Sequence, residues 1–185
     1  MKTYMMKIYW QYFKQIMLHK KYVFEECLKC GITWQGITHD LSKFSKQEFT
    51  RSAKRYFGEN TDKVKEEYVK SWLHHKGCNP HHWEYWTDYG KQGDIITHKV
   101  PYNYVIEMVC DWIGAGKAYE KEEWNQAEPL EYYNKVRAGR HFHKDTEKLI
   151  YKFLNCIKTY GLDEFHKLAK NSVLKEFYEL GKGIP

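Results

Sequence analysis

Six of the ten histidines lie before residue 83, and one of them is followed directly by an aspartate, as His39-Asp40. Imidazole nitrogen and carboxylate oxygen together suit zinc, manganese or iron. Neighbouring residues on a helix diverge by about 100°, so both side chains reach one metal ion only at a helix end or a local distortion. The pair by itself does not define a metal site, which needs further ligands among the histidines and acidic residues elsewhere in the chain.

Two further residues are expected to be polar groups inside the core. His19 falls on the apolar stripe of a predicted helix, where an unpartnered buried imidazole costs about 1–3 kcal/mol. Asp111 lies in the apolar run 107–113, and carboxylates are rarely buried without a partner or a metal. Both are candidate metal ligands. The alternatives are a core histidine bonded to a backbone carbonyl and a solvated acidic edge.

Two adjacent histidine pairs flank a short turn. His74-His75 ends one predicted helix, and His81-His82 follows the turn of residues 77–80. Imidazoles on both sides of such a turn can converge on one or two cations. The alternative is a polar, aromatic-rich corner in which these histidines hydrogen-bond and stack. Because adjacent residues compete for one helix face, the pattern leaves open which member of each pair points inward.

The order of these residues resembles the metal site of the HD-domain phosphohydrolase superfamily, which is a helical bundle. The resemblance implies that His19, His39, Asp40 and Asp111 are core ligands, with one of His74/His75 and one of His81/His82 added. It also implies that Asp40 and Lys43 are catalytic and that Lys43 faces the substrate phosphate. Ser42 replaces the glycine common in the superfamily's H-D-x-G-K form. Glu107, four residues before Asp111 on the same helical face, is expected to support a ligand.

The amino-acid sequences of several segments resemble a family of short bacterial and phage proteins of unknown function more closely than they resemble the HD-domain superfamily. The matching segments are 39–44, 74–86, 107–112 and 143–146, which are spread over most of the chain. This second resemblance implies no activity.

The first resemblance implies hydrolysis of a nucleotide or another small phosphate ester, with one or two divalent ions (Mn, Mg, Fe or Zn). Arg51 and Arg55 share a helix face after Lys43 and either contact the phosphate or form a solvated basic face. One alternative is a di-iron oxygenase of the same superfamily. Another is a non-catalytic helical adaptor that metal stabilises and that binds a host factor or nucleic acid.

A cluster of aromatic residues follows the second histidine pair. Trp83, Tyr85 and Trp86 can stack on a nucleobase, since aromatic faces do so without sequence preference. The alternative is core packing, because Phe, Trp and Tyr make up 17% of the chain.

Periodicity and capping residues predict one all-α domain over residues 1–185, a bundle of about 7–9 helices. No alternating strand is expected, and Asp88–Lys99 reads as a polar loop. In the first half of the chain, the expected helices are Tyr4–Cys30, Trp34–Asp40, one that begins with a capping box at Ser45 and runs to Phe57, and one that is capped by Thr61 or Asp62, continues to His75 and breaks at Gly77. A further helix begins at Asn79-Pro80 and runs to Trp86. The remaining expected helices are Pro101–Tyr119, a shorter one that Pro129 opens, one that is capped by Asp145 or Thr146 and ends at Gly161, and Asp163–Leu180.

The overall composition suits anionic partners. The formal charge of +6 suits nucleotides or nucleic acid, without distinguishing them. Five cysteines form no secreted-type framework, and the N-terminal residues lack the apolar core of a signal peptide. No run approaches the roughly 18 apolar residues of a membrane span. We therefore expect a cytoplasmic protein (host cytoplasm if phage-encoded) that does not associate with membranes.

Overall fold

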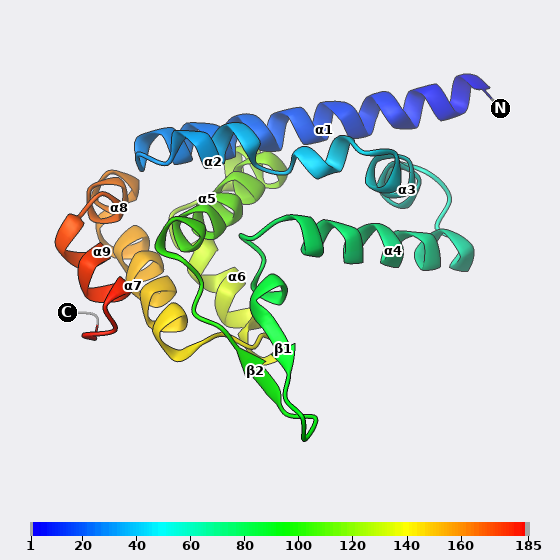
Figure 1. The fold of residues 1–185 in the computed structure, drawn as a ribbon. Helices are drawn as coiled ribbons and strands as arrows, with labels where there is room; N and C mark the ends of the chain where they lie inside the picture. The colour runs from blue at the N-terminus through cyan, green and yellow to red at the C-terminus, as the bar shows by residue number, and fades with distance from the viewer. Residues whose placement is uncertain (1, 184–185) are drawn as a thin grey trace.

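A computed structural model describes residues 2–183, and it confirms the all-α prediction (Figure 1). Within that range the chain forms nine α-helices and one short β-hairpin. The elements are α1 (Lys2–Lys29), α2 (Thr33–Thr38), α3 (Lys46–Phe57), α4 (Asp62–Cys78), β1 (Thr87–Tyr89), β2 (Ile95–Thr97), α5 (Tyr102–Tyr119), α6 (Glu128–Val136), α7 (Lys144–Tyr160), α8 (Leu162–Ala169) and α9 (Ser172–Glu179). Four 3-10 helices, η1 (Leu41–Phe44), η2 (Trp83–Trp86), η3 (Lys121–Glu123) and η4 (Arg137–Gly139), connect them.

The long helix α1 organises the fold because one stripe of its residues is buried along its whole length. The stripe comprises Ile8, Tyr12, Ile16, His19, Val23 and Cys27, at the predicted helical spacing. Its second half packs on α5 so closely that a Cβ at Gly114 would lie 2.5 Å from the Val23 side chain. His19 is therefore held inside the protein, opposite α5.

Two groups of helices pack against different halves of α1 (Figure 1). The α3–α4 hairpin packs against the N-terminal half, around a small cluster that includes Tyr12, Ile16 and Ala53. The main core lies at the other end, where α5 and α7–α9 bury Ile106, Phe153 and other apolar side chains. The predicted metal ligands lie between these two regions.

The region after α4 differs from the prediction. Helix α4 continues through Gly77 to Cys78, and Asn79-Pro80 opens a turn rather than a helix, with only η2 following. The segment expected to be a polar loop contains a hairpin, in which Thr87 pairs with Thr97 and Tyr89 with Ile95. The β-branched run of β2 favours an extended strand, and this two-residue-period signal is too short to stand out in the sequence.

The C-terminal helices also have different ends from those expected. His143 caps α7, since its Nδ1 accepts a hydrogen bond from the Asp145 amide, while Thr146 is buried. The final amphipathic stretch divides into α8 and α9, because the Asn171 side chain caps a new helix. Among residues 2–183, no helix combines the length and the hydropathy that crossing a bilayer requires.

Candidate metal centre

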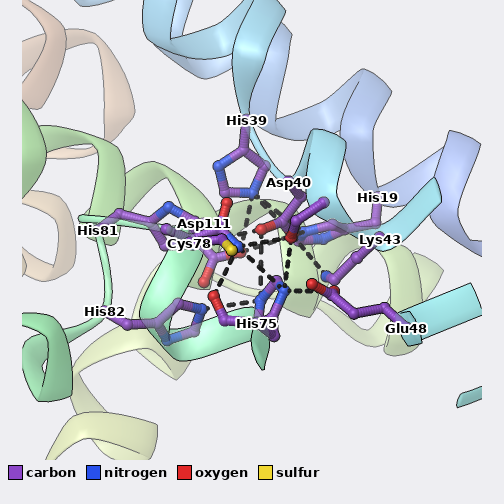
Figure 2. Close-up of polar contacts among 12 residues, drawn as sticks. His19, His39, Asp40, Lys43, Glu48, His75, Cys78, His81, His82 and Asp111 are labelled. Atoms are coloured by element: carbon purple, nitrogen blue, oxygen red, sulfur yellow. Dashed lines mark hydrogen bonds and ion pairs between the residues drawn. The ribbon is translucent and has the colours of Figure 1, made fainter. Parts of the chain in front are cut away.

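The His39-Asp40 pair lies in a distorted turn, not in the helix predicted for it. Helix α2 ends at Thr38, and Asp40 adopts a left-handed backbone with φ +56° before η1 begins. This conformation is uncommon outside glycine, although aspartate tolerates it better than most residues. The ammonium of Lys20 holds the turn by donating to the carbonyl oxygens of Ile37 and His39, both at 2.7 Å. The turn lets adjacent side chains point the same way (Figure 2).

A first group of four side chains surrounds one point. Nε2 of His19 lies 3.1 Å from Asp111 Oδ1, 3.6 Å from Asp40 Oδ2 and 3.4 Å from Nε2 of His39. Nε2 of His39 lies 3.3 Å from Asp40 Oδ2 and 3.4 Å from Asp111 Oδ1. A tetrahedral ion with bonds of about 2.0–2.1 Å places its ligands about 3.3–3.4 Å apart. The measured separations fit that geometry.

A second group shares Asp40 and adds three histidines. Oδ1 of Asp40 lies 3.4 Å from Nε2 of His75 and 3.5 Å from Nε2 of His81. Nε2 of His82 lies 2.9 Å from Nε2 of His75. Asp40 thus directs one carboxylate oxygen to each group, as Figure 2 shows, and can bridge two ions.

Two buried glutamates orient the imidazoles of these groups. Oε1 of Glu107 accepts from Nδ1 of His39 at 2.9 Å and from Nδ1 of His81 at 3.1 Å. Oε2 of Glu48 accepts from Nδ1 of His75 at 2.9 Å. A carboxylate bound to one ring nitrogen directs the other nitrogen toward a metal. Glu107, for which the sequence predicts a supporting role, thus contacts two candidate ligands, whereas the sequence analysis did not select Glu48.

Glu48 could have been found through the capping box, but that motif suggested another role. The Ser45 side chain accepts a hydrogen bond from the Glu48 amide, as a capping box requires. The Glu48 carboxylate, however, turns toward α4, where Oε1 also accepts from Nδ1 of His74 at 2.6 Å. His74 is half-buried, falls in neither group and contacts Glu48 instead.

The two adjacent histidine pairs differ in how many of their members reach the candidate ligand groups. From His74-His75 only the second residue points into the site, whereas both His81 and His82 join the second group. The difference follows from the backbone. The first pair is helical, while the second follows the extended turn after α4, where adjacent side chains are less constrained to diverge.

The two arginines proposed as phosphate contacts lie elsewhere. Arg51 is paired with Glu67 on α4 at 2.8 Å, on the outer side of the α3–α4 hairpin. Arg55 lies over the ring of Tyr68 at 5.9 Å. Neither lines the cavity beside the two groups. The prediction that they contact phosphate is therefore not supported by their positions, because their helix face turns toward α4 and solvent.

The two candidate aspartate ligands are ionised, as a divalent ion requires. Burial raises the pKa of the Asp40 carboxyl, but the charges of His39 and Lys43 outweigh it and hold that pKa well below its usual range. Contacts with His19 and His39 likewise outweigh burial and lower the pKa of Asp111. Burial and neighbouring imidazoles lower the pKa of His82 far enough to keep it neutral. Ionised carboxylates bind metal, as does the neutral imidazole of His82. His39 differs: although burial opposes its charge, Asp40 and Asp111 raise its pKa well above the usual range, so a metal ion would displace its proton.

Buried atoms without partners give a second indication. Among residues 2–183, no hydrogen bond of good geometry reaches Oδ1 of Asp40 or Nε2 of His81, although both atoms are inaccessible to solvent. Oδ2 of Asp40, by contrast, has the Lys43 ammonium as an ion-pair partner. Buried polar atoms normally have partners, and each exception needs an explanation. The two groups of residues therefore fit one or two bound divalent cations.

A cavity of about 240 Å³ reaches the first and second groups. Lys43 lines it, with its Nζ 2.5 Å from Asp40 Oδ2. Burial opposes the charged form of Lys43, but Asp40 and Asp111 raise its pKa and keep it protonated. The wall also carries several tyrosines, including Tyr12 and Tyr119. The cavity thus presents a cation and hydroxyl groups beside the candidate ligands.

Residues 8–156 match the model of a family described as "Family of unknown function (DUF5662)". The chain belongs to this family. Both ligand groups and the two supporting glutamates fall inside the matched range of the DUF5662 model. The predicted likeness to a family without known activity is confirmed, while the HD-domain resemblance stays a prediction. No curated protein and no solved structure significantly matches the chain.

Proposed function

We propose that this DUF5662 protein is a metal-dependent phosphohydrolase acting on a small phosphate ester. The observation that carries the proposal is the position of Asp40, whose two oxygens face two separate sets of imidazoles beside a cavity. A divalent ion held there would lower the pKa of a bound water and polarise a phosphoryl oxygen. The order and grouping of the ligands also lead us to infer a relationship to the HD-domain superfamily.

Lys43 is the residue proposed to hold the phosphate. Its ammonium is fixed by Asp40 and lines the cavity, so it can donate hydrogen bonds to phosphate oxygens and balance charge that develops on them. Asp40 joins the two ligand groups and orients Lys43. Glu107 and Glu48 keep the imidazole rings in position, so that little reorganisation accompanies substrate binding.

The test begins with metal content and continues with turnover. Protein purified without a histidine tag should contain at least about one metal ion per chain, and Asp40→Ala should lose it. After chelation, the protein is resupplied with Mn, Mg, Fe or Zn and screened for phosphate release from nucleotide mono-, di-, tri- and cyclic phosphates and from simple phosphate esters. Hydrolysis that depends on added metal is expected.

A matched pair of variants separates a catalytic from a structural effect. Lys43→Gln should reduce turnover at least about tenfold while leaving metal content unchanged, because the side chain is proposed to contact substrate and not metal. Lys46→Gln, on the exposed face of α3, should have no effect. Bound metal without hydrolysis of any ester would overturn the proposal and favour the non-catalytic adaptor.

A di-iron oxygenase is a second candidate, favoured by the number of imidazoles. Five histidines and two aspartates make up the two groups, which is rich in nitrogen for a hydrolytic site. In that case, purified protein would be coloured, with near-ultraviolet absorbance and two irons per chain, and would consume oxygen instead of releasing phosphate.

A further inference from the structure

A second cavity, of about 380 Å³, adjoins the metal centre. It lies between the end of α4, the loop leading to η2, and helices α5 and α6. The two cavities have common walls, formed by Trp72, His82, Asp111, Ala115, Tyr119 and Tyr132. A ligand that reaches the metal centre with one end can therefore place its other end in this second cavity.

The walls of the second cavity are largely aromatic. Trp72 comes from α4, Trp83 from η2, Trp112 from α5 and Tyr132 from α6. The Trp112 and Tyr132 rings meet edge to face, with centroids 6.0 Å apart. Aromatic side chains supplied by four separate elements favour a flat ring as ligand, because bases stack on such side chains.

Arg140 adds hydrogen-bond donors to these aromatic walls. Its guanidinium lies 5.1 Å from the Trp112 ring and 5.3 Å from the Tyr132 ring, and it donates to the Tyr132 hydroxyl at 2.9 Å. Within residues 2–183 it forms no ion pair, unlike Arg51, which is bound to Glu67. A guanidinium has five N–H donors, so Arg140 retains donors for acceptor atoms of a ligand.

Two carboxylates in the same walls have unsatisfied acceptor atoms. Oε2 of Glu84 and Oε2 of Glu128 are inaccessible to solvent, and no described residue donates a hydrogen bond to either. Glu128 lies against α5 at Gly116, where a Cβ would come within 2.2 Å of that oxygen. Buried carboxylate oxygens of this kind are suited to N–H groups of a ligand.

We propose that the second cavity binds a planar nitrogen heterocycle that carries an exocyclic amino group, as amino-substituted purines and pyrimidines do. The ring stacks on the tryptophans, its amino group donates to Glu84 or Glu128, and Arg140 meets its acceptor edge. The inference rests on the proposed function in one respect, since the ring would be the leaving-group portion of a phosphate ester held at the metal centre.

The test uses nucleosides, because they carry the ring, contain no phosphate and cannot be hydrolysed by this reaction. Indole N–H signals of the full chain are followed by NMR during titration with adenosine and guanosine. Signals of the cavity residues Trp72, Trp83 and Trp112 should shift. Trp10 and Trp34, which are 59% and 70% exposed on α1 and α2, serve as internal controls.

Two nucleoside pairs test the amino group alone. Purine riboside lacks the amino group of adenosine, and inosine lacks that of guanosine. In at least one pair the amino-bearing nucleoside should bind at least about tenfold more tightly, because a site built to hydrogen-bond an N–H group leaves its acceptor unpaired with the analogue. Equal affinities in both pairs, or no shift of the cavity indoles, would overturn the inference.

A matched pair of variants locates the acceptor. Glu84→Gln or Glu128→Gln should weaken the preference for the amino-bearing nucleoside, because a neutral amide oxygen is a weaker acceptor than a carboxylate. Glu131→Gln, exposed on the same helix as Glu128, should leave the preference intact. If Glu128→Gln does not fold, the nucleoside pairs still decide the question with the natural protein. Since no probe contains phosphate, this result is independent of the hydrolysis screen, and either proposal can fail alone.

Discussion

Glu107 is the position where one substitution should weaken both ligand groups. Its Oε1 accepts from His39 at 2.9 Å and from His81 at 3.1 Å, and each histidine belongs to a different group. Glu107→Gln keeps an acceptor oxygen but removes the charge. A hydrogen bond to a charged group contributes about 1.5–3 kcal/mol and a neutral one about 0.5–1.5 kcal/mol. Losing about 1 kcal/mol in each of two bonds predicts metal affinity about 30-fold weaker.

The assay is competition for metal against a chromophoric chelator, with the chelated protein as starting material. Glu107→Leu, which removes both hydrogen bonds, should bind at least about 100-fold more weakly. Glu122→Gln, at an exposed acidic residue, serves as the charge control. A dissociation constant for Glu107→Gln within about threefold of the natural protein, with an unchanged melting temperature, would refute the assignment of Glu107 as the support of both groups.

Three further outcomes follow from the packing. Gly114→Ala should destabilise the fold by about 1–3 kcal/mol, seen in urea unfolding, because the new Cβ meets Val23 where α1 crosses α5. Glu26 is fully buried, and although burial opposes its charge, His166 and Lys117 lower its pKa from 4.5 to about 2. The ionised Glu26 carboxylate therefore stabilises the folded state by about 3 kcal/mol. This stabilisation is present above pH 4.5 and lost as pH falls toward 2, so Glu26→Gln should remove the contribution of this carboxylate to the acid dependence of unfolding. Chelating bound metal should lower the melting temperature, with recovery on adding metal back, and a melting temperature insensitive to chelation would contradict metal binding by the folded state.

Local sequence signals were sufficient for most of the helices. Three local signals each predict a helix that the structure contains: the apolar stripe of α1, the capping pattern at Ser45 and the proline before α5. Each signal depends only on residues within one or two helical turns. The predicted and observed secondary structures differ at Asn79-Pro80 and in the β-hairpin. There the local signal is short, and the surrounding packing decides the conformation.

For the candidate site, the sequence identified the residue types that metal binding needs and most of the residues that come together. Spacing, the helical stripe and the resemblance together select His19, His39, Asp40 and Asp111, which form the first group. The sequence could not show that Asp40 turns its two oxygens to different groups. That depends on a left-handed backbone between two short helices, which residue type alone does not specify.

Apart from Glu107, tertiary structure alone decided which supporting and neighbouring residues belong to the site. Glu48 belongs to a capping box and Arg140 to no motif, yet helix packing brings Glu48 to His75 and Arg140 to the adjoining cavity. Conversely, Arg51 looked suitable and faces away. The physical reason is that a helix presents each side chain in one direction, and the neighbour it meets there is set by long-range packing rather than by local sequence.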